Sequence, residues 1–310
     1  MIEATEGNDR TLVIGNGFSA NYFTYKTLLM ASGIEDGSCL RNVFDALKTV
    51  DFEKVVRALE DAAIIERAYG HESRASELGD DAQSVREALV QAVNAIHPAH
   101  RDDIDYGSSA AFLRNFNAIF SLNYDLLLYW TILEDAGLSD GFGLGKHIGR
   151  FLGPFRENAY CDVYNLHGGL HLFSDGRGEI IKAVQTGEGV IATISDAIRN
   201  GRLPIYVAEG TSRQKIQKIE SVPYLRHCYA RLRENAATVF IYGHSADPND
   251  AHIYRAIFES GAKRIYFGVY QPDAEKLKTF DGELARYQKI WGLDTTYEFY
   301  DSESAAVWVT

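Results

Sequence analysis

The chain has 310 residues, of which 46% are hydrophobic and 24% are charged, and its formal net charge is −12. This composition is typical of a globular protein that buries a full core. The negative charge argues against sequence-independent binding to nucleic acid, because the phosphate backbone would be repelled.

The hydropathy of the sequence and its N-terminal stretch also argue against membrane insertion. No apolar run approaches the roughly 18 residues that a membrane span needs. The N-terminal stretch MIEATEGNDR has neither the basic start nor the apolar run of a signal peptide. We therefore expect a cytoplasmic protein with no membrane contact.

The first apolar run, 12–14, predicts a buried strand, and it breaks at once into a glycine loop. The spacing of Gly15, Gly17 and Ala20 fits G-x-G-x-x-G/A, the turn through which doubly wound folds receive a dinucleotide. Glycines let the backbone turn sharply, and free N–H groups at a following helix start would face the pyrophosphate. A plain tight turn between a strand and a helix is the alternative. The loop residues assigned to nucleotide binding are Gly15, Asn16, Gly17, Phe18 and Ser19.

Residues 25–105 carry helical patterns, which predict a helical insertion after the first strand. One apolar stripe consists of Val55, Val56, Leu59, Ala63 and Ile64, and a second consists of Val85, Leu89, Val93 and Ile96. We expect Asp80 or Asp81 to cap the second helix. Such stripes are nearly always packing surfaces, so they are assigned no chemistry.

Strand patterns return after the insertion. They fall at the start of 116–130, twice within 160–173 around a turn at Gly168-Gly169, at 204–208, 237–242 and 263–270, and in the short C-terminal stretches YEFYDS and AAVWV. Strands alternating with helices predict an α/β fold, a Rossmann-like and mostly parallel sheet with helices on both faces. The predicted domains are a Rossmann-type domain of 1–24 with 106–310, and the helical insertion 25–105.

Two features that suggest other chemistry are discounted. The Gly-rich loop 139–147 is not a P-loop, because its spacing before Lys146 is one residue short and no Ser or Thr follows. Cys39, Cys161 and Cys228 are widely scattered and form no C-x-x-C pair, so they indicate free thiols and not a zinc site or disulfides. No metal site is predicted.

Polar residues follow several of the apolar runs directly. The breaks are Asn16-Gly17, Asn123-Tyr124-Asp125, His167-Gly168 and Gly243-His244-Ser245. Because the carboxyl ends of parallel strands share one edge, where ligands bind, we expect these breaks to converge in one crevice.

The motifs GNGFS, SLNYD, NLHG and YGHSADPNDAHI, in this order and spacing, resemble the sirtuin-like superfamily. The likeness is strongest to its bacterial branch, whose better-known members hydrolyse NAD in antiphage defence, and within it to a domain family of unknown function. It covers roughly residues 10–24 and 110–270.

The resemblance implies hydrolysis of NAD to ADP-ribose and nicotinamide, with NAD as the substrate and no separate cofactor. It makes Asn123 and His167 the catalytic pair, with Asp125 orienting one of them or binding on the nicotinamide side. A neutral amide can bind ribose hydroxyls without titrating, and histidine can act as a base near neutral pH. The residues assigned to the ribose side of the site are Gly243, His244, Ser245 and Asp250.

The chain also departs from the sirtuin deacetylases. It has no four-cysteine zinc module and no acyl-lysine channel signature, which puts protein deacetylation in doubt. The helical region stands in that place, as in several sirtuin-like NAD hydrolases. Because uncontrolled hydrolysis would drain cellular NAD, we expect gating by homo-oligomerisation or by a regulatory partner protein.

Simpler roles remain open for these residues. Asn123 can cap the following helix, Asp125 can be a first-turn carboxylate, and Asp250 can cap the helix after it. Two other functions also remain open. One is an ordinary NAD-dependent oxidoreductase with Glu35 or Asp36 on the ribose, and the other is a module that binds NAD or an ADP-ribose derivative without cleaving it.

Overall fold

A computed structural model describes most of the chain, namely residues 9–22, 28–98, 101–135, 137–142, 151, 160–175, 179–184, 189–207 and 211–308. The chain divides into two compact units. The first consists of Met1–Asn21, Arg101–Gly169 and Gly210–Thr310, and the second of Tyr22–His100 and Leu170–Glu209.

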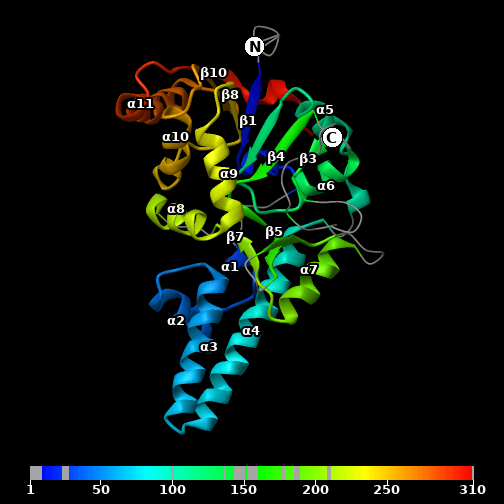
Figure 1. Cartoon of the computed structure of the whole chain (residues 1–310), viewed down its shortest axis with the longest axis vertical. Coiled ribbons are helices and arrows are strands. Elements are labelled where there is room, and N and C mark those ends of the chain that lie inside the picture. Colours follow the sequence, from blue (N-terminus) through cyan, green and yellow to red (C-terminus); the bar gives the residue numbers. More distant parts are fainter. Residues whose placement is uncertain are drawn as a thin grey trace. The chain divides into compact units, whose positions relative to one another are not determined.

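Within the described residues, the first unit is built on a seven-stranded parallel sheet (Figure 1). Its order is β10-β9-β8-β1-β2-β4-β3. The strands are β1 (Arg10–Ile14), β2 (Ala118–Ser121), β3 (Leu138–Ser139), β4 (Cys161–Asn165), β8 (Thr238–Tyr242), β9 (Arg264–Val269) and β10 (Thr296–Asp301). Leu12, Val13 and Ile14 of the central strand are at most 1% exposed, as expected of a strand covered on both faces.

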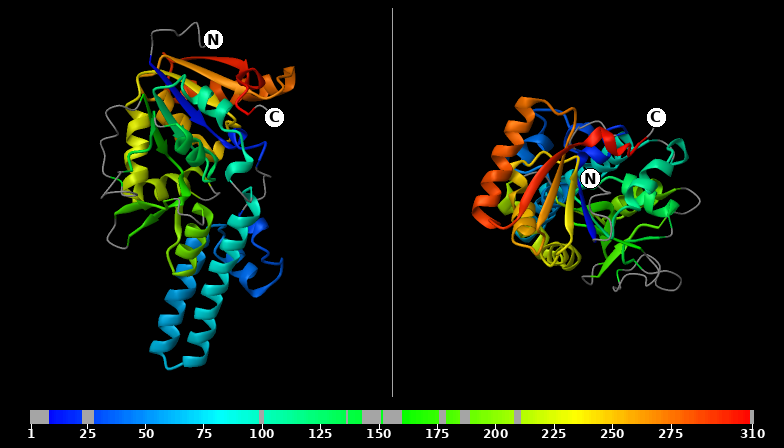
Figure 2. Two further views of the ribbon diagram at one scale, coloured as in Figure 1. Left: turned by 90° about the vertical axis from the view of Figure 1, so that its right-hand side faces the viewer. Right: turned by 90° about the horizontal axis from the view of Figure 1, so that it is seen from above.

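Helices cover both faces of this sheet. The view from above shows the yellow and orange helices on one side and the teal helices on the other (Figure 2). The helices are α5 (Gly107–Leu113), α6 (Leu127–Glu134), α8 (Ser212–Ser221), α9 (Pro223–Arg233), α10 (Ala251–Phe258) and α11 (Ala274–Trp291). This arrangement confirms the predicted α/β class, a Rossmann-like, mostly parallel sheet with helices on both faces.

The second unit contains the predicted helical insertion. Its described elements are α1 (Leu28–Ala31), α2 (Cys39–Ala46), α3 (Phe52–Ala68), α4 (Glu72–Ile96) and α7 (Val190–Arg199), with a small sheet ordered β6-β5-β7. These strands are β5 (Gly168–Ser174), β6 (Ile180–Lys182) and β7 (Pro204–Tyr206), and β5 begins in the first unit. The predicted Rossmann-type domain includes Leu170–Glu209, but in the structure these residues group with the helices.

The helical hairpin of α3 and α4 follows the predicted stripes with two differences. Val85, Leu89 and Val93 are fully buried, but Ile64 is 63% exposed. The helix begins at Glu72, so the expected caps Asp80 and Asp81 lie inside it. The buried periodicity extends upstream through Ala75 and Leu78, and this apolar face continues the helix past the aspartates.

The C-terminus differs from its prediction. The described part of AAVWV, residues 305–308, does not form a strand: a 3₁₀ helix, η6 (Ser302–Ala305), is followed by irregular chain as far as residue 308. Val307 is 2% exposed, and the Trp308 indole N–H donates to the carbonyl oxygen of Phe18. Trp308 therefore contacts the first glycine loop.

Two further expectations concern the Gly-rich loop and membrane insertion. Most of the Gly-rich loop 139–147 lies outside the described residues. Among the helices that the structure describes, none has both the length and the apolar character to cross a bilayer.

Candidate functional site

The predicted polar breaks meet at the carboxyl edge of the first unit's sheet. In the register, Ile14 at the end of β1 lies beside Ser121 of β2 and Tyr242 of β8. Ser121 in turn lies beside Asn165 of β4. The loops that follow these four strands are therefore neighbours, as the sequence predicts.

The loops after β1 and β8 pack backbone against backbone. The Gly17 N–H donates to the Gly243 carbonyl oxygen at 2.9 Å. A Cβ atom at Gly17 would lie 2.4 Å from the Gly243 Cα, and Gly243 has a φ of +68°. Only glycines fit this contact, so it accounts for Gly17 and Gly243 without a pyrophosphate.

The backbone donors of the first loop differ from the prediction. The N–H groups of Gly15, Gly17, Phe18 and Ser19 donate to the carbonyl oxygens of Tyr242, Gly243, Gly15 and Asn16 respectively. The loop forms a single 3₁₀ turn, η2 (Asn16–Phe18), and not the start of an α-helix. The expectation that these N–H groups face a pyrophosphate is therefore corrected, because their hydrogen bonds are already made within the fold.

A chain of three side chains links the first loop to the loop after β2. Asn123 Nδ2 donates to Ser19 Oγ at 3.1 Å, and Ser19 Oγ donates to Asp125 Oδ2 at 2.6 Å. The other carboxylate oxygen of Asp125 accepts from the Leu127 N–H at 2.9 Å, at the start of α6. Asp125, and not Asn123, therefore serves the first turn of this helix.

This chain fixes which way the Asn123 amide faces. Because the Ser19 hydroxyl gives its proton to a carboxylate, it can only accept from Asn123, so Nδ2 must lie on that side. Asn123 Oδ1 is buried and has no hydrogen-bond partner among the described residues. Leaving such an acceptor unpaired costs about 1–3 kcal/mol, which a ligand hydroxyl would recover.

The Asp125 carboxyl sits in a nearly dry environment. Burial raises its pKa above the ordinary value, and the hydrogen bonds from Ser19 and the Leu127 N–H partly oppose that shift. Both of its oxygens accept hydrogen bonds within the fold, and it positions Asn123 through Ser19.

His167 lies in the turn between β4 and β5, and its backbone N–H donates to the Ser121 carbonyl oxygen at 3.2 Å. Its Nε2 atom is 3.3 Å from Nε2 of His252 on α10. Burial holds the pKa of His167 well below its ordinary value and lowers that of His252 to about 4. Both imidazoles are therefore neutral at pH 7, and one Nε2 carries the proton that bridges them.

Ser212 at the start of α8 completes this histidine pair. Its Oγ accepts the His252 backbone N–H at 2.9 Å and lies 3.1 Å from His252 Nδ1. A hydroxyl can donate to Nδ1 or accept from it, so Ser212 supports either tautomer of His252.

Asp250 joins a second group of partly buried polar side chains at the same edge. Lys215 Nζ lies 2.7 Å from its Oδ1, and His244 Nε2 lies 3.4 Å from its Oδ2. Burial alone would raise the pKa of Asp250, but the hydrogen bond from His244 and the Lys215 charge outweigh it and hold the pKa below its ordinary value. The carboxylate is ionised and bonded to neighbours, while Ser245, five residues earlier in the chain, is exposed.

The sequence does not predict the role of Lys215 or the pairing of His252 with His167 and Ser212. Their partners lie 35, 85 and 40 residues away along the chain, so no local spacing signals them. The sequence also indicates no metal ligands, whereas the structure brings His167, Asp250 and His252 together.

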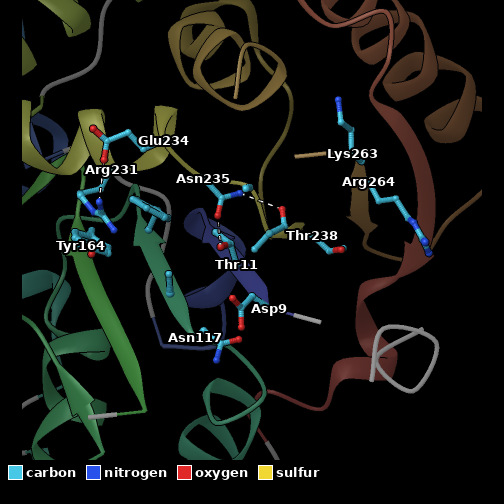
Figure 3. Close-up of a pocket in the computed structure, with 14 residues that line it drawn as sticks. Asp9, Thr11, Asn117, Tyr164, Arg231, Glu234, Asn235, Thr238, Lys263 and Arg264 are labelled. Atoms are coloured by element: carbon cyan, nitrogen blue, oxygen red, sulfur yellow. Dashed lines mark hydrogen bonds and ion pairs between the residues drawn. The ribbon is translucent and has the colours of Figure 1, made fainter. Parts of the chain in front are cut away.

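A cavity of about 710 Å³ lies at the opposite, amino edge of the sheet (Figure 3). It is lined by strand starts and the end of α9, and by none of the predicted site residues. Its polar groups are largely paired: Thr11 Oγ1 donates to Asn235 at 2.7 Å, and Arg231 donates to Glu234 at 2.8 Å (Figure 3). Ligands of open parallel sheets bind at the other edge, so no function is assigned to this cavity.

These features define the class: a Rossmann-type α/β protein with buried asparagine and histidine side chains at the carboxyl ends of its strands. A family model described as "Domain of unknown function (DUF4917)" matches residues 12–308, and the chain belongs to that family. A search among curated proteins gives no match. The family description names no activity, so the sirtuin-like resemblance stays a prediction.

Proposed function

We propose that this protein is a sirtuin-like NAD glycohydrolase that converts NAD and water to ADP-ribose and nicotinamide. The observation that carries the proposal is the buried, unpartnered Oδ1 of Asn123, held in place by Ser19 and Asp125. It lies at the sheet edge where His167 is also anchored, through Ser121.

Asn123 would hold the ribose. Its Oδ1 would accept a ribose hydroxyl while its Nδ2 stays bonded to Ser19. Cleavage of a glycosidic bond passes through an oxocarbenium-like state, so a fixed neutral acceptor can orient the sugar without titrating. Because the amide is already oriented, little rotamer entropy is lost when the ligand binds.

His167 would take the proton of the attacking water. Water bonds to C1′ of the nicotinamide ribose, the C1′–N1 bond breaks, and nicotinamide leaves with that electron pair. In one tautomer, His167 donates its Nε2–H to Nε2 of His252, and its Nδ1 is then the basic atom. His252 in turn donates a hydrogen bond from Nδ1–H to Ser212 Oγ. The low pKa of His167 keeps it unprotonated at neutral pH, at the expense of base strength.

Asp125 is a positioning residue in this mechanism, because both of its oxygens are already bonded. The proposed nucleotide side remains Gly15, Asn16, Phe18, Gly243, His244, Ser245 and Asp250. The two glycines and the buried Phe18 would shape the loops, and the other side chains would contact the ligand, because the loop N–H groups are engaged.

A cytoplasmic NAD hydrolase must be restrained, so we propose an effector in bacterial antiphage defence, gated by self-association or a partner protein. The helices of the second unit are the proposed place of that control.

The structure bears on the two rival functions differently. Glu35 and Asp36 lie in the second unit, before α2, and not after a strand adjacent to β1, which disfavours the oxidoreductase. The low basicity of His167 favours the second rival, a module that binds NAD or ADP-ribose without turnover.

The test is product analysis on the purified full chain. NAD is incubated with protein over a range of concentrations that allows self-association, and products are separated by chromatography. We expect equal amounts of nicotinamide and ADP-ribose and no NADH. Binding of ADP-ribose by calorimetry with no nicotinamide released would support the binding module, and neither binding nor turnover would reject both.

A further inference from the structure

Three potential metal ligands lie together at the carboxyl edge of the sheet. One donor atom each from His167, Asp250 and His252 lies within 4.8 Å of the other two. The two histidine Nε2 atoms are 3.3 Å apart. Two imidazole nitrogens bound to a tetrahedral zinc ion, at about 2.0–2.1 Å each, stand roughly 3.3 Å from one another.

The residue types and their burial suit a metal site. Imidazole nitrogens and a carboxylate oxygen are ordinary ligands of zinc. His167 and His252 are buried and Asp250 is partly buried.

The surrounding side chains match the outer contacts of a metal site. A metal-bound histidine usually donates its other ring N–H to a fixed acceptor. Ser212 Oγ lies 3.1 Å from His252 Nδ1 and is itself held by the His252 backbone N–H. His244 Nε2, 3.4 Å from Asp250 Oδ2, holds the carboxylate in the same way.

We propose that His167, His252 and Asp250 form a binding site for one divalent transition-metal ion of the zinc type. An ion bound at Nε2 would place the ring proton of His167 on Nδ1, the atom that accepts the proton of the water in the proposed mechanism, so metal binding would suppress hydrolysis. This second statement rests on the proposed function, whereas the binding site itself does not.

Lys215 sets the strength of this site. Its ammonium group lies 2.7 Å from Asp250 Oδ1 and already balances the carboxylate charge. An incoming ion must displace it or share the carboxylate with it, so binding is weaker than in a dedicated structural zinc site. Removing the Lys215 charge should therefore strengthen metal binding.

The experiment is a zinc titration of the full chain at pH 7 against a chromophoric chelator, without NAD. We expect one ion per chain, an affinity at least tenfold lower in His252→Ala, and an affinity several-fold higher in Lys215→Met. His71→Ala is the matched control, because His71 is exposed on the helical hairpin, and it should bind as the wild type does.

Cobalt binding to the wild type keeps the test independent of whether a variant folds. Tetrahedral nitrogen and oxygen ligation gives intense visible absorption, and we expect that band at one equivalent. No stoichiometric zinc, only the weak absorption of surface-bound cobalt, or an unchanged affinity in folded His252→Ala or Lys215→Met would each overturn the site. Nicotinamide release with and without zinc is then measured separately, so failure of hydrolysis leaves the binding result readable.

Discussion

The two edges of the same sheet present polar side chains in different ways. At the amino edge, a wide cavity is lined by polar side chains that pair with one another, such as Thr11 with Asn235 (Figure 3). At the carboxyl edge, Asn123 is buried and keeps an acceptor with no partner among the described residues. The size of a hollow is therefore a poorer guide to function here than an unpaired polar atom held by a fixed network.

The largest difference should be the one between two asparagine substitutions, one at each edge of the sheet. Asn123→Ala should lower kcat for NAD hydrolysis by about 10²–10³-fold, the usual loss when one preorganised polar contact is removed. Asn117→Ala, at the amino-edge cavity, should leave kcat unchanged. Nicotinamide release by both variants, with thermal melting as the folding check, makes this comparison; equal losses would remove the distinction between the edges.

The next effect concerns the glycine contact that brings two carboxyl-edge loops together. Gly17→Ala places a Cβ 2.4 Å from the Gly243 Cα, so backbone must move, and we expect a loss of about 2–3 kcal/mol in the free energy of unfolding. The control is Gly282→Ala inside α11, where a Cβ meets nothing within 4 Å and should add up to about 1 kcal/mol. Urea denaturation measures both, and a neutral Gly17→Ala would show that the loops are not in close contact.

The buried histidines should make the protein sensitive to acid. The folded pKa of His252, about 4, lies below its unfolded value of 6.5, so the unfolded chain takes up the proton first as pH falls. Its contribution should fall by about 2 kcal/mol between pH 7 and pH 5. Asp250 is an acid whose pKa is lowered in the folded state, and it too makes the folded state less stable as pH falls. Its stabilisation is complete above its unfolded pKa, near 4, and is lost below it.

His97 and His171 are also buried with lowered pKa values, so the wild type alone does not isolate this effect. His252→Gln should therefore show a smaller loss of stability between pH 7 and pH 5 than the wild type. Denaturation curves at the two pH values give the difference, and equal losses would mean that His252 is not buried in its neutral form.

The smallest effect is expected from the residue that orients the amide. Ser19→Ala leaves Asn123 in place but removes the acceptor of its Nδ2. We expect kcat to fall about tenfold, or about 1.4 kcal/mol, with KM nearly unchanged, because the amide is present but less ordered. Steady-state kinetics separate the two constants; a rise in KM alone would make Ser19 a binding residue.

The strand ends could be predicted because their signals are local. Runs such as 12–14 and 238–242 are apolar and end in glycine or polar residues, and parallel pairing brings their ends together. The roles that could not be predicted depend on partners far along the chain. The Gly17 N–H is taken by Gly243, and Asp250 is bonded by Lys215, and neither contact leaves a trace in local spacing.

The helical hairpin shows the same limit at a boundary. Asp80 and Asp81 have the residue type of a helix cap, but the buried face that includes Ala75 and Leu78 extends the helix upstream to Glu72. Tertiary packing decided the start of α4, and residue preference did not.

The most direct measurement is a crystal structure of the full chain with ADP-ribose bound. We predict that a ribose hydroxyl lies within hydrogen-bond distance of Asn123 Oδ1, while Nδ2 stays bonded to Ser19 Oγ. ADP-ribose in the amino-edge cavity beside Arg231 and Thr238, or a ligand at the carboxyl edge that leaves Asn123 Oδ1 unpaired, would contradict it.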